Sequence, residues 1–384
     1  MQFNFYNDKY TIPPNHAQSQ FFNILSSRIQ ILSRFILPQL PNPIVPSIIN
    51  IPADGQCSFV AIINKHSPTR FFSLDSAFVS ENDTVYLEDK TGAIRISSDI
   101  PTTSLVSGMV IGISGHKKHP NSNTFQITRI YEPFQNEFPF SFLDIEYKIA
   151  IISELHLNSP QFDYPTAKNF FESLSKENIS LLIVIGSSFS IDETYGELSD
   201  DWDIKKELID FSPNQMLEML FELTPIPKIY VPGELDPTDF TWPQPPINQT
   251  LFGGLQNTHL CTNPALFDLD TIKFQVCSGL AVQDVVNQTH YSFHEAQIML
   301  LRWRHLAPSM PELIQPHSSM IADLLVMDEI PNFFICGNSD SFNCTEYSGV
   351  RVISVPSFCK TSTAVYLNLK SGDVSSQVFS RSHD

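Results

Sequence analysis

The sequence is poor in positive charge. Its 384 residues include 23 Lys and Arg against 41 Asp and Glu, which gives a formal net charge of −18 at pH 7. Residues 145–384 alone hold 13 Lys and Arg against 30 Asp and Glu, so a difference of −17 falls in this part. Tight binding of a phosphate backbone requires clustered Lys and Arg. We therefore expect the chain to make little direct contact with nucleic acid.

Long hydrophobic runs are also missing. No apolar run in the sequence reaches the roughly 18–20 residues that a membrane-spanning helix requires. Residues 1–10 are polar and aromatic, and they lack the basic-then-apolar order of a secretory signal. The sequence thus predicts no membrane contact and a location inside the cell.

Common ligand and nucleophile motifs are absent as well. The sequence contains no phosphate-binding Gly-x-x-x-x-Gly-Lys-Ser/Thr loop, no Gly-x-Ser-x-Gly elbow and no Cys-x-x-Cys pair. Scattered cysteines argue against a zinc site or a disulfide framework, so we expect most of them to be buried, reduced thiols. The exposure of Cys336, in a predicted strand-end loop, stays open. The six cysteines are Cys57, Cys261, Cys277, Cys336, Cys344 and Cys359.

An amphipathic segment stands near the N-terminus. Apolar residues recur at three- and four-residue spacing from Phe21 to Ile36 with polar residues between them, which predicts a helix that ends at Pro38. The apolar face of this helix packs either on its own domain or on a separate protein. We assign residues 1–40 to an N-terminal amphipathic helical segment.

Residues 41–135 contain short strand-like segments separated by turns. Apolar and polar residues alternate at 93–97 and 125–128, and the spacing predicts a small closed barrel that resembles an OB fold. The region carries 7 basic and 8 acidic residues and so lacks the basic groove typical of single-strand binding. Lys117 and Lys118 lie in a predicted turn. Three interpretations of this turn remain open: a solvated hairpin tip, a phosphate contact, or a metal site formed with the neighbouring histidines. We expect the barrel to dock protein rather than nucleic acid.

Residues 136–146 read as a polar connector, and residues 147–384 alternate apolar strands with amphipathic helices. The run 181–185 is continuously apolar, as is typical of a strand that is covered on both faces. The alternation predicts an α/β sandwich with parallel strand pairing. An acidic stretch from Asp192 to Asp203 is either a solvated loop or a docking site for a basic partner.

Four predicted strands of this region end in short loops with polar residues. Ligands of α/β folds bind in the crevice at the carboxyl ends of such strands. These loops resemble the metal-binding loops of calcineurin-like metallophosphoesterases, in which Asp-x-His, Gly-Asp-x-x-Asp, Gly-Asn-His and Gly-His-x-His hold two cations. The matching positions here, in chain order, are Glu154, His156, Ser187, Leu235, Asp236, Asn338 and Asp340.

Most of the metal ligands of that family are replaced in this chain. Ser187 takes the place of the bridging Asp, and Glu234-Leu235 takes the place of the Asn-His pair. A two-metal site needs a bridging carboxylate and several further ligands. We therefore interpret these positions as the vestige of an inactive site, with no metal and no other cofactor. One weak metal site remains open, formed by Glu154, His156, Asp236 and Asp340.

An inactive phosphoesterase domain that follows an OB fold resembles the small, or B, subunits of eukaryotic replicative DNA polymerases. Residues 231–246, VPGELDPTDFTWPQPP, resemble the delta-type signature of that family. The resemblance covers most of the chain, strongly from about residue 227 onward and more loosely before. Further matching stretches are 261–264, 278–279, 304–305, 336–338 and 355–358.

This resemblance implies a non-catalytic accessory subunit located in the nucleus. It implies that the OB fold and the inactive phosphoesterase domain together hold the cysteine-rich C-terminal module of a polymerase catalytic subunit and a third, elongated subunit. Two alternatives remain: an active metal-dependent phosphoesterase or nuclease, as archaeal relatives are, and a B-type small subunit of the alpha or epsilon class. The loss of most metal ligands favours the non-catalytic subunit over an active enzyme, and the signature in residues 231–246 favours the delta type.

Overall fold

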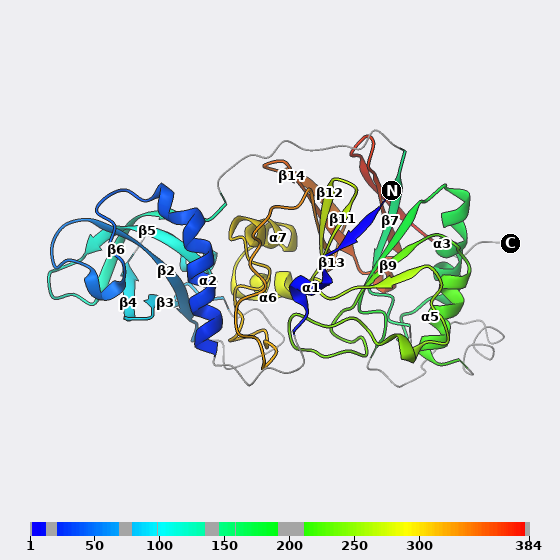
Figure 1. Ribbon diagram of the computed structural model, residues 1–384, viewed down its shortest axis with the longest axis horizontal. Helices are drawn as coiled ribbons and strands as arrows, with labels where there is room; N and C mark the ends of the chain where they lie inside the picture. Colours follow the sequence, from blue (N-terminus) through cyan, green and yellow to red (C-terminus); the bar gives the residue numbers. More distant parts are fainter. Residues whose placement is uncertain are drawn as a thin grey trace. The chain divides into compact units, whose positions relative to one another are not determined.

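The chain divides into two compact units, each assembled from separate stretches of sequence (Figure 1). The sandwich unit comprises Met1–Thr11, Phe138–Leu280 and Pro331–Asp384, and the barrel unit comprises Ile12–Glu137 and Ala281–Ile330. These units interleave along the chain, whereas the domain boundaries predicted above follow each other in order. The computed structural model describes residues 2–12, 21–68, 79–97, 99–134, 146–157, 159–190 and 211–380.

Five strands form the closed barrel of the barrel unit. The strand order is β2-β3-β4-β6-β5, and the parallel pairing of β4 with β6 closes it. Inward-facing rings fill the interior, where Phe59 and Phe125 pack edge to face with centroids 5.2 Å apart. The predicted OB-like barrel is thereby confirmed. Its strands are β2 (Cys57–His66), β3 (Thr84–Asp89), β4 (Gly92–Ser97), β5 (Val110–Lys117) and β6 (Thr124–Tyr131).

Helix α2 (Phe21–Ile36) packs its apolar face on the barrel. Leu32 and Ile36 are buried in one cluster with Ile62 and Val110 of the barrel strands. Close approach requires a glycine beneath the helix, because a Cβ on Gly112 would lie 2.4 Å from Ile36 Cγ2. Of the two partners that the sequence left open for this face, the structure selects the helix's own unit. Short 3-10 helices flank the barrel strands: η1 (Leu37–Gln39), η2 (Ile48–Asn50) and η3 (Thr102–Ser104).

The barrel unit also contains residues 281–330, which the sequence assigned to the other domain. This stretch holds α6 (Leu280–Gln288) and α7 (Phe293–Arg302), and α7 begins with a capping box made by Ser292 and Glu295. Backbone bonds join it to the barrel segment, since the Phe134 amide donates to the Arg302 carbonyl at 3.2 Å. A buried ion pair between Arg28 of helix α2 and Asp323 joins it further.

Two six-stranded sheets make the sandwich unit, in the orders β1-β11-β12-β13-β15-β14 and β10-β9-β8-β7-β16-β17. The sheets bury one shared core, and helices α3 and α5 cover the outer face of the second sheet over another core (Figure 1). Along β7, Ile149 and Ile151 face the shared core, whereas Ala150 and Ile152 face the helices. This two-sided burial explains the continuous apolar runs. The helices are α3 (Tyr164–Lys176), α5 (Pro213–Glu222) and α8 (Phe358–Thr361), with the 3-10 helix η4 (Gln249–Leu251).

The parallel pairs predicted for this region are present. Strands β7, β8, β9 and β10 run parallel, and so do β12, β13 and β15. The α/β sandwich is therefore confirmed together with the barrel. The strands of this unit are β7 (Lys148–Ser153), β8 (Leu181–Ile185), β9 (Lys228–Val231), β10 (Thr258–Leu260), β11 (Ala265–Leu269), β12 (Ile272–Cys277), β13 (Phe333–Ser339), β14 (Asn343–Tyr347), β15 (Val350–Pro356), β16 (Thr363–Asn368) and β17 (Val374–Val378).

The N-terminal residues form an unexpected edge of the first sheet. Strand β1 (Phe3–Phe5) pairs antiparallel with β11, and the short helix α1 (Asn7–Tyr10) follows it (Figure 1). Phe5 stacks on the ring of His259 with centroids 3.6 Å apart. The predicted helical segment 1–40 contains no such strand, because three residues have too little periodicity to indicate one.

The remaining expectations concern cysteines, turns and membrane contact. All six cysteines are free, and Cys336, whose exposure the sequence left open, is fully buried. Lys118 and His119 are exposed at the turn between β5 and β6. Within the described ranges, no helix is both long and apolar enough to cross a membrane. The acidic stretch 192–203 and most of the connector 136–146 lie outside the described residues.

Candidate functional site

The loops after four parallel strands meet at one pocket of the sandwich unit. Strand β7 pairs with β8 and β8 with β9, so Ser153, Ile185 and Val231 end in register and their loops leave the sheet together. The pocket has a volume of about 240 Å³. Of the predicted positions it brings together Glu154, His156, Ser187, Leu235 and Asn338, but not Asp236 or Asp340. Its lining is completed by Gly186, Glu234, Ser278 and Lys360.

Two glycines allow the second and third loops to touch. A Cβ on Gly186 would lie 2.0 Å from Asp236 Oδ2 and 2.2 Å from the Gly233 nitrogen. A Cβ on Gly233 would in turn lie 2.5 Å from the Ser187 nitrogen. Only glycine leaves room for such a backbone contact. The pocket floor is therefore built from two loops in direct contact.

Asp236 points into the protein and ties these loops together. Its Oδ1 accepts hydrogen bonds from the Ser188 amide at 2.7 Å and the Phe189 amide at 3.2 Å. Its Oδ2 accepts from the Gly233 amide at 2.8 Å and the Tyr230 hydroxyl at 2.9 Å. Burial raises the pKa of Asp236 to about 6, and the hydrogen bonds act in the opposite direction. With four donors around it, this carboxylate serves the loop structure and does not line the pocket.

Ser187 and Leu235 also have structural contacts. The Ser187 hydroxyl accepts a hydrogen bond from the Leu235 amide at 3.0 Å, and the Leu235 side chain is aliphatic. In the fourth loop, the Asn338 amide donates to the Ser153 hydroxyl at 3.2 Å, which fixes the loop to strand β7. Asp340 is exposed beyond that loop. These positions therefore supply neither a carboxylate that could bridge two metal ions in the pocket nor a histidine ligand.

Glu154 and His156 are the predicted residues that do present polar atoms to the pocket. Both have left-handed backbone conformations, with φ of 52° and 49°. His156 Nε2 lies 3.6 Å from Glu154 Oε1. Glu154 is only 6% exposed, and its Oε2, like His156 Nε2, is buried without a hydrogen-bond partner. The pocket thus contains polar atoms whose bonding capacity is unused.

The sequence interpretation undervalued two charged residues at this pocket. The Glu234 residue is exposed to solvent, yet partial desolvation of its carboxyl group and the neighbouring Glu154 raise its pKa to about 7. Lys360 is exposed, and no ion pair involves it in the part of the chain that the structure describes. Lys360 lies just beyond the matching stretch 355–358, which was the available signal for its position.

These residues do not fit the two-metal centre of phosphoesterases. Such a centre needs a bridging carboxylate that faces the pocket, and Asp236 faces away while Ser187 offers only a hydroxyl. Among the residues that the structure describes, no three His, Cys, Asp or Glu side chains are placed to hold a metal ion. The weak site predicted from Glu154, His156, Asp236 and Asp340 stays a prediction that the geometry does not support.

A network of polar side chains that reaches the pocket at Ser278 holds the signature loop 231–246 in place. Gln244 Nε2 donates to the carbonyls of Gly233 at 3.2 Å and Asp239 at 3.1 Å. Asn263 Nδ2 donates to Gln244 Oε1 at 2.7 Å and to the Ser278 hydroxyl at 2.8 Å. The family-like stretches at 261–264 and 278–279 therefore fix the shape of this loop.

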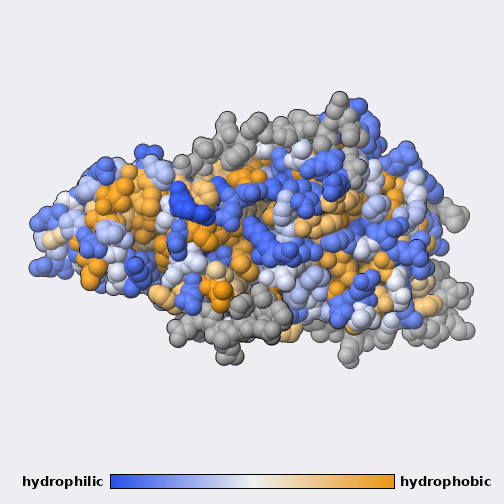
Figure 2. Space-filling view, viewed as in Figure 1, coloured by the Kyte–Doolittle hydropathy of each residue, from blue (hydrophilic) through white to orange (hydrophobic). Residues whose placement is uncertain are grey.

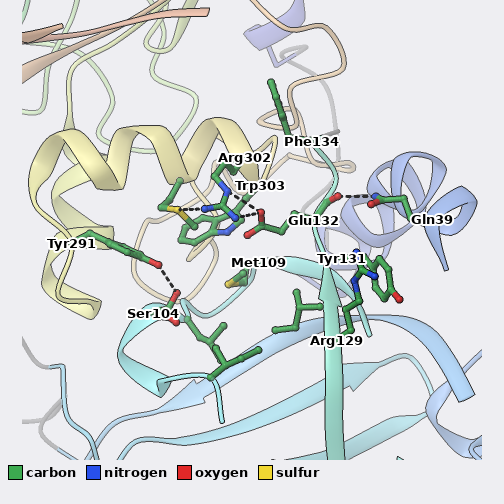
Figure 3. Close-up of a pocket in the computed structure, with 14 residues that line it drawn as sticks. Gln39, Ser104, Met109, Arg129, Tyr131, Glu132, Phe134, Tyr291, Arg302 and Trp303 are labelled. Carbon is green, nitrogen blue, oxygen red and sulfur yellow. Dashed lines mark hydrogen bonds and ion pairs between the residues drawn. The ribbon is translucent and has the colours of Figure 1, made fainter. Parts of the chain in front are cut away.

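A second pocket, of about 360 Å³, lies in the barrel unit between barrel and helix residues (Figure 3). Arg302 pairs with Glu132, with Nε at 2.8 Å from Oε2, and the Tyr291 hydroxyl points to the Ser104 carbonyl at 3.5 Å. Trp303 is fully buried, and its Nε1 has no hydrogen-bond partner. No sequence pattern indicated this pocket, because it combines Gln39 with residues 100–134 and 291–303, which were assigned to three different segments of the chain.

Comparisons with known proteins agree with this architecture. The family of DNA polymerase alpha/epsilon B subunits matches residues 149–344, about half of the chain. The family described as DNA polymerase delta subunit OB-fold domain matches residues 20–130. The two matches stand in the same order as the barrel and sandwich strands.

Individual relatives agree with the families. The DNA polymerase delta small subunit of Oryza sativa subsp. japonica is 25% identical over 98% of this chain and 97% of its own length. That of Saccharomyces cerevisiae is 25% identical over 75% of this chain and 69% of its own. Among solved structures, an archaeal phosphodiesterase aligns with 60% of this chain and 99% of its own at 14% identity, with a TM-score of 0.35. This last likeness is too remote to indicate activity.

Proposed function

Because the chain belongs to the family of DNA polymerase alpha/epsilon B subunits and carries the delta-type OB-fold domain, we propose that it is a non-catalytic scaffold subunit of DNA polymerase delta. The observation that carries this proposal is the similarity to a delta small subunit along 98% of the chain. The delta-type signature in loop 231–246 supports it and disfavours an alpha- or epsilon-type subunit.

The chemistry of the sandwich pocket supports a role without catalysis. Asp236 is committed to four hydrogen-bond donors, Ser187 accepts from a backbone amide, and Leu235 offers no donor atom. Phosphodiester hydrolysis by two metals requires both cations to be held in place for in-line attack. We infer that the ligand positions Glu154, His156, Ser187, Leu235, Asp236, Asn338 and Asp340 are vestigial and that the subunit uses no cofactor.

Exposed apolar side chains support binding to other proteins. Figure 2 shows apolar areas between hydrophilic ones on the face in view. Phe240 is 76% exposed on the signature loop, whose neighbouring Trp242 is buried. Ile49 and Ile321 of the barrel unit are 74% and 58% exposed. Apolar surface of this kind is typical of interaction sites when it forms patches.

We infer that these surfaces bridge two partners in the nucleus. One is the cysteine-rich C-terminal module of the catalytic subunit, and the other is a third, elongated subunit. The acidic balance of residues 145–384 supports assembly through protein contacts with little direct contact to nucleic acid. DNA replication and repair synthesis are the processes that such an assembly would serve.

Co-purification tests the proposal. The tagged chain is isolated from its native cell, and bound proteins are identified before and after treatment with a zinc chelator. We expect the catalytic subunit of polymerase delta to co-purify and to be lost on chelation, because its contact is a metal-folded module. Recovery of an alpha- or epsilon-type catalytic subunit, or of no polymerase, would contradict the proposal.

A further inference from the structure

The sandwich pocket contains a buried carboxylate oxygen without a hydrogen-bond partner. Glu154 and Glu234 both line it, and so does Asn338. Glu154 is more than nine-tenths buried, yet its Oε2 makes no hydrogen bond. A buried carboxylate oxygen without a partner is costly, because it has lost its hydration without compensation. The pocket therefore suits an occupant that supplies positive charge and N–H donors.

The pocket's own basic residues, His156 and Lys360, donate no hydrogen bond to Glu154 Oε2. His156 Nε2 is 3.6 Å from Glu154 Oε1, beyond hydrogen-bond distance, and Lys360 stays exposed at the pocket. A divalent cation is a poor occupant, since it needs several oxygen or imidazole ligands at once. Across the described ranges no three candidate ligands gather. One carboxylate pair is instead sufficient for a single ammonium or guanidinium group.

The size and rigidity of the pocket agree with such an occupant. A water molecule takes about 30 Å³ in the liquid, so a volume of about 240 Å³ holds several waters or one long side chain. The floor is fixed by the Asp236 hydrogen bonds and by the contact of Gly186 with Gly233. A site that is already formed loses little entropy when it binds.

We propose that the former metal pocket is the receptor for a Lys or Arg side chain of the polymerase catalytic subunit, held by Glu154 and Glu234. The inference rests on the proposed function, because it assigns the partner's contact to this pocket. In this account the basic side chain stands where phosphoesterases place a metal, and Asn338 accepts one of its N–H groups.

The first test measures the affinity of the purified full-length chain for the purified full-length catalytic subunit. Removing a buried charge partner has large effects on binding. We expect the double variant Glu154→Gln and Glu234→Gln to weaken binding by at least about tenfold and to reduce its salt dependence. Glu222→Gln, an exposed carboxylate of the same unit, is the matched control and should leave affinity unchanged. Thermal unfolding checks that each variant is folded.

Unchanged affinity of the folded double variant would overturn the inference while the proposed function stands. Failure of the wild-type chain to bind the catalytic subunit would overturn both. Manganese alone serves as the competing probe. If the wild-type chain binds manganese tightly and the double variant does not, the pocket is a metal site and the inference is wrong.

A second test identifies the occupant directly. A photo-crosslinking amino acid replaces Leu235, which lines the pocket, within the intact polymerase complex. We expect a crosslink to a catalytic-subunit segment that contains Lys or Arg, and loss of affinity when that residue becomes Glu. Pairing that change with Glu234→Lys should restore binding. A crosslinked segment without a basic residue, or no rescue by the charge exchange, would contradict the inference.

Discussion

Arg28 of helix α2 and Asp323, 295 positions later in the chain, form an ion pair of 2.6 Å between two fully buried side chains. Arg28 also donates to the carbonyls of Gly108 at 2.9 Å and Met310 at 2.7 Å. His305 Nε2 lies 2.9 Å from Asp323 Oδ2. Burial alone would raise the pKa of Asp323, but Arg28 and His305 hold it well below its usual range. This cluster joins the helix, the barrel and residues 303–330 within one unit.

The cluster predicts a large effect of Arg28→Met on stability. The change leaves the Asp323 carboxylate buried without its main partner, so we expect the free energy of unfolding to fall by about 3–5 kcal/mol. Arg34→Met is the matched control on the same helix, because the Arg34–Asp328 pair has side chains 64% and 52% exposed. The control should cost at most about 1 kcal/mol. Equal losses in urea unfolding would contradict the structural role of the cluster.

Asp236 predicts a similar contrast in the sandwich unit. Asp236→Asn keeps the shape of the side chain but replaces one acceptor oxygen with an NH₂ group, which then faces hydrogen-bond donors. We therefore expect the free energy of unfolding to fall by about 2–3 kcal/mol. Glu222→Gln, an exposed carboxylate of the same unit, should change the free energy of unfolding by no more than about 0.5 kcal/mol. Chemical denaturation of both variants checks this. A neutral Asp236→Asn would show that the loops do not depend on this carboxylate.

The contact between the loops predicts that Gly186 tolerates no side chain. A methyl group there meets Asp236 Oδ2 at 2.0 Å and backbone of the third loop at 2.2 Å, so Gly186→Ala should cost about 1–3 kcal/mol or more. Gly254→Ala is the control, because its Cβ would meet nothing within 4 Å. The melting temperatures of the two variants provide the comparison. If Gly186→Ala and Gly254→Ala have the same melting temperature, the two loops are not in the close contact that excludes a methyl group at Gly186.

Lys228 predicts a dependence of stability on alkaline pH. Its Nζ donates to the carbonyls of Thr224 at 2.8 Å and Ile226 at 3.0 Å, and burial lowers its pKa to about 8. In the unfolded chain Lys228 has the ordinary lysine pKa of about 10.4. Between pH 8 and this value its side chain is protonated in the unfolded chain and largely neutral in the folded protein. Stability therefore rises with pH in this window, by up to about 3 kcal/mol.

Lys228→Met isolates this effect from other titrating groups. The variant lacks the ammonium, so the stability of the wild type relative to the variant should increase from pH 7 to pH 10. Urea unfolding of both proteins at the two pH values measures the difference. A constant difference across the window would mean that Lys228 keeps its ordinary pKa in the folded state.

Local patterns were sufficient to predict much of the fold. The alternating residues at 93–97 indicated a barrel strand, and the continuous apolar run 181–185 indicated a strand covered on both faces. Contacts between distant residues were out of reach. Phe3 pairs with Leu269, and residues 281–330 join the barrel unit, although no local pattern marks either association.

The candidate site was predicted in position but not in orientation. Sequence patterns placed Glu154, His156, Ser187 and Leu235 at strand ends that the sheet brings to one pocket. They did not show that Asp236 turns inward, because its direction depends on four donors from neighbouring segments. Residue type alone gives the chemistry of a side chain, whereas the packed loops decide where it points.

Reconstitution from purified full-length subunits tests the central claim most directly. The chain is mixed with the catalytic subunit of polymerase delta and the masses of the species are measured, while the chain alone is assayed with manganese on a phosphodiester substrate. We predict a complex with one copy of each subunit and no hydrolysis above the buffer. Hydrolysis by the chain alone, abolished by His156→Ala, together with no complex, would show that it is an active phosphoesterase and not a scaffold.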